Sequence, residues 1–369
     1  MSKSIFEDVG EKGESVQAAP GGAEAVRERD RSRVRWWLIA LALMVVVQIL
    51  VGGLTRVTDS GLSITEWRPV TGMVPPMSEE AWEAELQKYR STHEYQVQNK
   101  GMSLEDFKSI YYWEWGHRLW GMLIGFAFVI PFAFFYFTNA IPTGWLSRIA
   151  LVGALGLLQG VIGAWMVESG LRDRLDVSQY RLAVHLGLAF LILGAIEWHV
   201  LSLGRPDWAL LQARRRREEP IRLLAYAMVG VCFVQVLMGA FVSGMDAGGS
   251  YPEWPTMEGG FYPSDTPYHP FEEPGAAHFT HRIVGYLVAL AAFAFFWRAR
   301  GSGAAKTRLW GKIALGIVLA QILIGIATVL HGAPASWAII HQFGAILVFG
   351  GLVHAAHQTA YPKEEKLAG

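Results

Sequence analysis

Eight long apolar runs constrain this chain more than any other feature of its sequence. Each run contains roughly the 20 residues that a helix needs to cross the hydrocarbon core of a bilayer. Because lipid offers no hydrogen-bond partners, a chain crosses it only as helices or as a closed barrel. The sequence therefore predicts an all-α polytopic membrane protein with spans near residues 36–55, 117–137, 146–166, 181–202, 221–243, 279–297, 309–330 and 336–358.

Composition agrees with this class and gives no indication of nucleic-acid binding. The chain has 369 residues, of which 52% are hydrophobic and 17% are charged, whereas soluble domains carry about 25% charged residues. Its net charge is +0, so it lacks the basic footprint of a nucleic-acid-binding protein. The one cysteine, Cys232, lies within the fifth run and is expected to be a small buried hydrophobe.

Charge is distributed unevenly between the loops, which predicts an orientation. Lys and Arg gather before the first span and in the loops after the fourth and sixth spans, whereas loop 245–277 contains neither. The positive-inside rule therefore places both termini in the cytoplasm and the long loops 57–116 and 245–277 outside. The N-terminal segment has no apolar signal core and is too acidic for a mitochondrial transit peptide. We therefore expect a bacterial inner (plasma) membrane protein.

The two halves of the chain resemble each other. Every odd-numbered span carries Gln-x-x-x-Gly, interpreted as a helix-packing element, and every even-numbered span carries a histidine near its outer end. Four spans per half preserve the orientation, so the halves are parallel repeats. The sequence predicts two four-helix bundles, an N-terminal half at 36–205 and a C-terminal half at 221–360. A basic linker at 206–220 joins the halves. A disordered cytoplasmic tail with a basic end precedes them at 1–35, and a cytoplasmic tail follows at 361–369.

Four histidines at repeat-related positions indicate a cofactor. Ionisable residues within spans are costly and are usually functional. Two neutral imidazoles on neighbouring antiparallel helices suit the axial positions of a haem iron. A single cysteine excludes cysteine-based metal sites, and a compact zinc or copper site needs three or four ligands at one point. We therefore expect two haem sites, with iron ligands His117 and His185 in the first half and His281 and His341 in the second.

Residues beside these histidines fit the same interpretation. Gly121 and Gly285 follow His117 and His281 by four residues, and a glycine one turn away leaves room for a flat macrocycle. Arg118 and Arg282 lie at the outer interface, where an arginine fork suits the carboxylates of a haem, although interfacial snorkelling would also explain them. The remaining histidines lack repeat partners and are expected to be structural or solvated.

Glu114 distinguishes the first half from the second. It lies three residues before His117, on the same helical face, whereas His278 occupies the equivalent position before His281. A carboxylate there can transfer protons or stabilise a developing cation, and a site without one can relay electrons. Two structural alternatives remain, in which Glu114 caps its helix or orients His117.

Several motifs around these histidines resemble the heme A synthase family of alphaproteobacteria and mitochondria. They are "GGLTRVTDSGLSITEWRPVTGMVPP" from Gly52, "WEWGHR" around Glu114, "GAFVSGMDAG" from Gly239 and "HFTHR" before Arg282. The resemblance covers nearly the whole chain beyond the N-terminal tail. One departure is that many bacterial members carry a cysteine pair in an outer loop, which this chain lacks. Chemistry through such a pair is therefore excluded here.

The resemblance implies an enzyme that oxidises the C8 methyl of haem O to a formyl group by successive hydroxylations, giving haem A for cytochrome oxidase. It implies that His281 and His341 hold a haem b cofactor, that His117 and His185 flank haem O, and that Glu114 matches the family's important acidic residue. It also implies water-derived oxygen, a membrane electron acceptor, and haem O synthase and oxidase assembly factors as partners. The Gly/Ala-rich helix surface permits a homo-oligomer without requiring one.

Two rival functions account for part of the sequence. A di-haem b-type membrane electron-transfer protein without substrate turnover explains the four histidines but leaves Glu114 without a role. A transporter built on repeats would often carry helix-breaking residues in corresponding spans. Pro131 lies inside the second span and has no repeat partner, which argues against a transporter.

The predicted orientation leads to a direct topology test. A reporter that is active only in the periplasm, fused after residue 260, should be active because loop 245–277 lies outside. Reporter activity is measured in intact cells, with the same reporter fused in the 206–220 linker as the inactive control. A cytoplasm-dependent reporter that works after residue 260 would contradict the orientation.

Overall fold

Eight helices of the described chain are long and apolar enough to cross a membrane. The computed structural model describes residues 22–68, 71–171, 174–264 and 266–363. Each predicted span falls inside one helix, which confirms the all-α polytopic membrane fold. These helices are α1 (Gly22–Val57), α4 (Leu104–Phe137), α5 (Leu146–Gly170), α6 (Gln179–Leu203), α8 (Glu219–Gly244), α9 (Pro274–Ala299), α10 (Ala305–Leu330) and α11 (Ala335–Ala360).

The first helix begins earlier than the sequence predicted. Residues 22–35 belong to α1, so the expectation of disorder to residue 35 is wrong for this part. Residues 1–21 lie outside the described part of the chain, as do residues 364–369 of the predicted C-terminal tail. The Ala, Glu and Arg residues of segment 22–35 are good helix formers. Arg31 also donates to the carbonyl of Leu203 at 3.1 Å and pairs with Asp207 at 2.7 Å, which fixes the basic end against the following elements.

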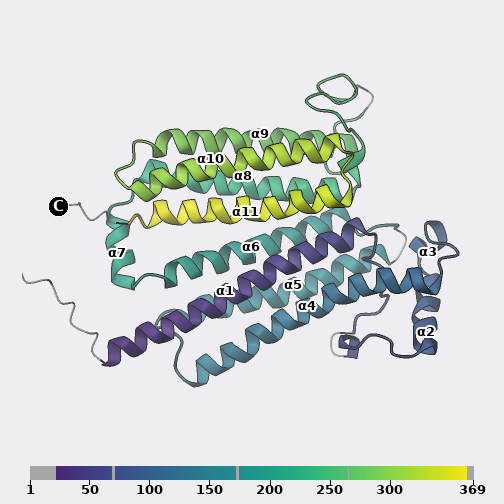
Figure 1. Cartoon of the computed structure of the whole chain (residues 1–369), viewed down its shortest axis with the longest axis horizontal. Helices are drawn as coiled ribbons and strands as arrows, with labels where there is room; N and C mark the ends of the chain where they lie inside the picture. The colour runs from purple at the N-terminus through teal and green to yellow at the C-terminus, as the bar shows by residue number, and fades with distance from the viewer. Residues whose placement is uncertain (1–21, 69–70, 172–173, 265, 364–369) are drawn as a thin grey trace, which may run out of the picture.

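Helix packing follows the internal repeat (Figure 1). In the first half α1 packs on α4 and α6, and α5 packs on α6; in the second half α8 packs on α9 and α11, and α10 packs on α9 and α11. The halves meet where α6 contacts α8 and α11 and where α1 contacts α11. One apolar core cluster contains residues of all eight helices. The expected division into two bundles therefore stays a prediction.

The long loop between α1 and α4, called the outer loop after its predicted side of the membrane, folds into a small helical layer. It contains η1 (Thr71–Met73), α2 (Glu79–Arg90) and α3 (His93–Val97). The side chains of Ser78, Thr92 and Ser103 cap the following helices by accepting backbone N–H groups. An aromatic core formed by Trp82, Tyr89, Tyr95, Phe107 and Tyr111 packs this layer against the extended start of α4.

The loop of the second half contains η2 (Ala247–Gly249) and an antiparallel bridge between Met257 and Gly260. Figure 1 shows it at the same end of the molecule as α2 and α3, while α7 (Asp207–Arg215) and the end of α11 lie at the other end. The basic linker is therefore partly helical. Arg205 and Arg214 of this region bind the carbonyl and hydroxyl of Tyr361, which ties the end of α11 to the linker.

Backbone contact between the halves generates a stability prediction. A Cβ placed on buried Gly244 of α8 would lie 2.9 Å from the Cα of Gln179, at the start of α6. Because backbone cannot move aside cheaply, Gly244→Ala should lower stability by about 1–3 kcal/mol, measured as a lower thermal midpoint in detergent. Gly230→Ala in the same helix meets no atom within 4 Å and is the matched control. Equal midpoints for both variants would contradict close packing of α6 on α8.

Candidate functional site

One large cavity lies between the helices and extends through both halves. Its volume is about 1630 Å³, and its lining includes His117 and His185 of the first half and His281 and His341 of the second. Small-molecule sites usually occupy about 300–1,000 Å³, so this space is sufficient for more than one sizeable ligand. The structure thus brings the four predicted histidines to one internal space.

Each of these histidines lies between a glutamine and a glycine of the preceding odd-numbered span. The glutamine Nε2 contacts a ring nitrogen at 3.1–3.3 Å, and a Cβ placed on the glycine would lie 2.8–3.3 Å from the histidine Cε1. Each imidazole therefore packs directly against a Gln-x-x-x-Gly element. The four sets are Gln48–Gly52–His117, Gln159–Gly163–His185, Gln235–Gly239–His281 and Gln321–Gly325–His341.

The second-half pair has the arrangement of facing ligands. The ring centroids of His281 and His341 are 6.3 Å apart at an interplanar angle of 77°, too far apart for a direct hydrogen bond. His281 Nδ1 and the Oε1 atoms of Gln235 and Gln321 are buried without a hydrogen-bond partner in the described chain. Buried polar atoms are normally satisfied. Two imidazoles across a gap, with unpartnered polar atoms around them, therefore fit a group held between them, and the histidine chemistry fits a haem iron.

Glu114 is buried and hydrogen-bonded to the outer loop. It is 2% exposed, and its Oε2 accepts hydrogen bonds from Ser63 Oγ at 2.7 Å and from the Ile64 amide at 2.8 Å. Its Oε1 pairs with Arg118. Helix α4 begins at Leu104, so Glu114 lies well inside the helix and does not cap it. Its hydrogen bonds hold the 63–64 segment and Arg118, and none of them joins it to His117.

The equivalent position of the second half has no carboxylate. His278 is 2% exposed, and its Nδ1 is buried without a partner. Arg282 donates to the carbonyls of Thr256 and Tyr251 at 3.1 and 3.0 Å, as Arg118 does to those of Glu66 and Ile64 at 3.0 and 2.9 Å. Both arginines therefore fix their own outer loop at the edge of the cavity.

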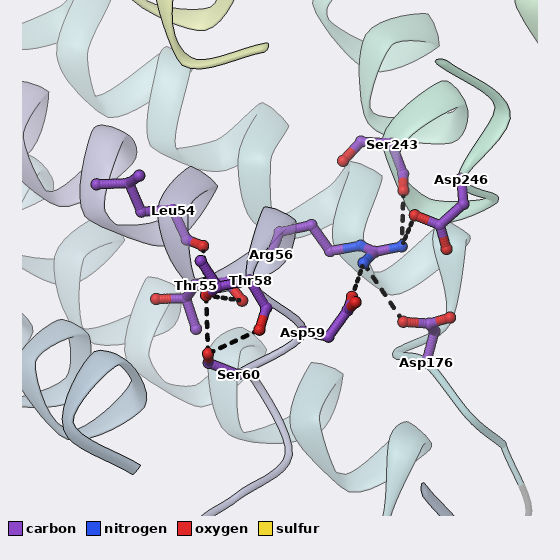
Figure 2. A network of polar contacts seen from close by, with 9 residues as sticks. All are labelled: Leu54, Thr55, Arg56, Thr58, Asp59, Ser60, Asp176, Ser243 and Asp246. Carbon is purple, nitrogen blue, oxygen red and sulfur yellow. Dashed lines mark hydrogen bonds and ion pairs between the residues drawn. The ribbon is translucent and has the colours of Figure 1, made fainter. Parts of the chain in front are cut away.

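Arg56 is a functional candidate that the sequence did not single out. Figure 2 shows its guanidinium between Asp59, Asp176 and Asp246, with the Ser243 carbonyl beside it. Nη1 lies 3.0 Å from Asp59 and 3.5 Å from Asp176, and Nη2 lies 2.6 Å from Asp246 and 2.9 Å from the Ser243 oxygen. Asp246 and Ser243 belong to the second half, so Arg56 joins the halves at the outer end of the cavity.

Glu94 is the second residue that the sequence did not single out. It lies on α3, is 3% exposed and lines the same cavity as Glu114. Its Oε2 atom is buried without a hydrogen-bond partner in the described residues. No motif or repeat points to it, because its position depends on how the outer loop folds over α4.

Three histidines near the other end of the molecule have structural partners. His354 stacks on Trp310 with ring centroids 4.0 Å apart, His357 contacts Ser202 Oγ at 3.1 Å, and His199 packs edge-on against Trp145. None of the three lines the cavity. These contacts agree with the expected structural role, which stays a prediction.

Comparison with known proteins gives a consistent family assignment. A model of the cytochrome oxidase assembly protein family matches residues 35–353. Heme A synthase of Dinoroseobacter shibae is 48% identical and is covered over 99% of its length by the whole of this chain. The heme A synthase of Cereibacter sphaeroides is 45% identical over 98% of this chain and 96% of its own length. That of Ruegeria pomeroyi is 45% identical over 100% of this chain and 99% of its own length.

Fold and site together define a multi-pass membrane protein with two repeat-related histidine pairs facing one internal cavity. The chain belongs to the cytochrome oxidase assembly protein family, and within it to the heme A synthases.

Proposed function

We propose that this protein oxidises the C8 methyl of haem O to a formyl group by successive hydroxylations, giving haem A for cytochrome oxidase. The observation that carries the proposal is the difference between two matched sites, since the first holds the buried carboxylate Glu114 where the second has His278. The names of the relatives support it. They do not favour the alternative of a di-haem b electron carrier, which also leaves this difference unexplained.

In this proposal the halves have separate roles. His281 and His341 hold a haem b, which supplies a redox-active iron that takes up electrons when it is bound. His117 and His185 flank the substrate haem O in the same cavity. Arg118 and Arg282 lie at the cavity edge, where their guanidinium groups suit the carboxylates of the two macrocycles.

Glu114 suits the stabilisation of positive charge. Its carboxyl accepts hydrogen bonds from Ser63 and the Ile64 amide and pairs with Arg118, so its position in the cavity wall is fixed. When the methyl carbon loses electrons, a carboxylate held in a mostly apolar cavity stabilises the developing cation. Water then supplies the oxygen, and the electrons leave to an acceptor in the membrane.

We also propose a bacterial inner membrane location with cytoplasmic termini. Arginines concentrate at the end of the molecule that holds α7 and the start of α1, in agreement with the positive-inside rule. The histidine-bearing ends of the even-numbered spans then lie toward the periplasmic side. Haem O synthase and oxidase assembly factors are the expected partners, and homo-oligomers are compatible with the apolar helix surface.

Pigment analysis tests the function directly. The purified protein should yield haem B together with haem O or haem A when extracted pigments are separated by chromatography and identified by mass. Haem O added to the purified protein with an oxidant should become haem A. If only haem B is extracted and added haem O stays unchanged, the electron-carrier function is correct.

The division of roles predicts different effects for the two histidine pairs. His281→Ala and His341→Ala should each remove the absorption of bound haem b, because an axial ligand is lost. His117→Ala and His185→Ala should keep most of this absorption and abolish haem A formation. Absorption spectra and pigment extraction of the four variants measure both effects. Equal bleaching by all four would contradict separate cofactor and substrate halves.

The role of Glu114 predicts a stalled enzyme when its charge is removed. Glu114→Gln keeps the size of the side chain and an oxygen for Ser63 and Ile64, so the fold and haem b absorption should persist. Haem A formation should fall by about 10²–10³-fold, the usual cost of losing one electrostatic contact to a transition state, and haem O or the alcohol should accumulate. Near-normal haem A output would show that Glu114 only holds the loop.

A further inference from the structure

Glu94 has the features of a proton-transfer group. It is 3% exposed and lines the cavity together with Glu114, and its Oε2 atom is buried without a partner in the described chain. A buried polar atom without a partner in a ligand cavity indicates that its partner belongs to the bound state. Thr92 caps α3, and the Glu94 carbonyl accepts the Gln98 amide at 2.8 Å, so its backbone is firmly placed.

The groups around Glu94 favour its neutral form. The Tyr89 hydroxyl of α2 contacts it, and the carboxyls of Glu114 in α4, Asp176 before α6 and Asp59 after α1 face it. The arginines that contact these carboxyls are paired with them: Arg118 with Glu114, and Arg56 with Asp59 and Asp176. Burial raises the pKa of the Glu94 carboxyl most, the Tyr89 contact lowers it, and the three carboxyls raise it, with a net value of about 8.

The two carboxyls of the first-half site therefore have opposite environments. Glu114 accepts three hydrogen bonds, whereas Glu94 has an unpartnered Oε2 atom and a pKa raised to about 8. A pair of carboxyls in such different environments divides into an electrostatic stabiliser and an acid–base group. An acid–base group is most effective when its pKa lies near the working pH.

We propose that Glu94 is the proton acceptor of the first-half site and exchanges protons with the outer surface past Asp59 and Asp176. The inference rests on the proposed function. The side chain of Asp59 is 66% exposed and that of Asp176 is 36% exposed, and both line the cavity, so they connect Glu94 with solvent.

The proton balance of the reaction requires such a group. Conversion of the methyl with one water to the alcohol breaks one C–H bond and one O–H bond, forms one C–O bond, and releases two protons and two electrons. Oxidation of the alcohol to the formyl group again releases two protons and two electrons. The electrons reduce an oxidised one-electron carrier in the membrane. Glu94 first gives up its proton outward and then takes up one released in the cavity.

The rate of haem A formation at different pH tests the proposal. In the wild-type holoenzyme the rate should rise as pH increases through about 8, because only ionised Glu94 accepts a proton. Glu94→Gln should lose this rise and fall by about 10²-fold or more above pH 8, while haem O binding and haem b absorption persist. Glu114→Gln should lower the rate and keep a rise with pH, but with the midpoint moved downward, because it removes one of the carboxyls that raise the pKa of Glu94. Glu83→Gln on α2, an exposed carboxyl paired with Arg90, is the unaffected control.

Tyr89→Phe provides a second variant should Glu94→Gln not accumulate as folded protein. Because the hydroxyl lowers the pKa of Glu94, its removal should move the midpoint of the pH profile upward. An unmoved midpoint, or wild-type rates and pH dependence in Glu94→Gln, would overturn the proposal.

Infrared titration separates this proposal from the proposed function. Without added haem O, the spectrum of the wild type minus that of Glu94→Gln should show a protonated carboxyl band at pH 6.5 that disappears above about pH 8. Absence of that band in the wild type would show Glu94 to be ionised and would overturn the proposal. If the band titrates as expected but the wild type makes no haem A, the proposed function fails and Glu94 remains a buried proton-exchanging carboxyl.

Discussion

The contact of each cavity histidine with a glutamine and a glycine determines the internal geometry of this protein. An imidazole inside an apolar bundle requires a polar partner, since an unpaired polar group in lipid or protein interior is costly. The glutamine of the preceding odd span supplies it, and the glycine one turn further lets the ring approach the helix. Repeated four times, this contact fixes the register of each helix pair and directs all four rings into one cavity.

The difference between the halves depends on the outer loops. A buried carboxylate needs hydrogen-bond donors, and Glu114 receives them from Ser63, the Ile64 amide and Arg118. The loop that supplies Ser63 and Ile64 is in turn packed on the aromatic core of α2, α3 and α4. The second half has a shorter loop and places His278 at the same position. The repeated helices thus place the histidines in both halves, and the two loops differ in the groups that they hold beside them.

Much of this arrangement was predictable from local pattern. Apolar runs of sufficient length give the eight spans, and the spacing of Gln48, His117 and their counterparts gives the repeat. The start of α1 at Gly22 was missed, since its charged residues are stabilised by contacts with Leu203 and Asp207, far along the chain. Glu94 and Arg56 were missed for a similar reason, because their partners come from several loops.

The sequence by itself determined the membrane class, the number of spans, the internal repeat and the four histidines, because hydrophobic length and helical periodicity are local properties. Only the tertiary structure decided that all four rings face one cavity, that Glu114 is buried and hydrogen-bonded to Ser63 and Ile64, and that Glu94 is a buried carboxyl lining the same cavity. The charge state of a carboxyl depends on burial and on neighbouring groups. Those neighbours are brought together by chain segments distant in sequence, and only folding specifies them.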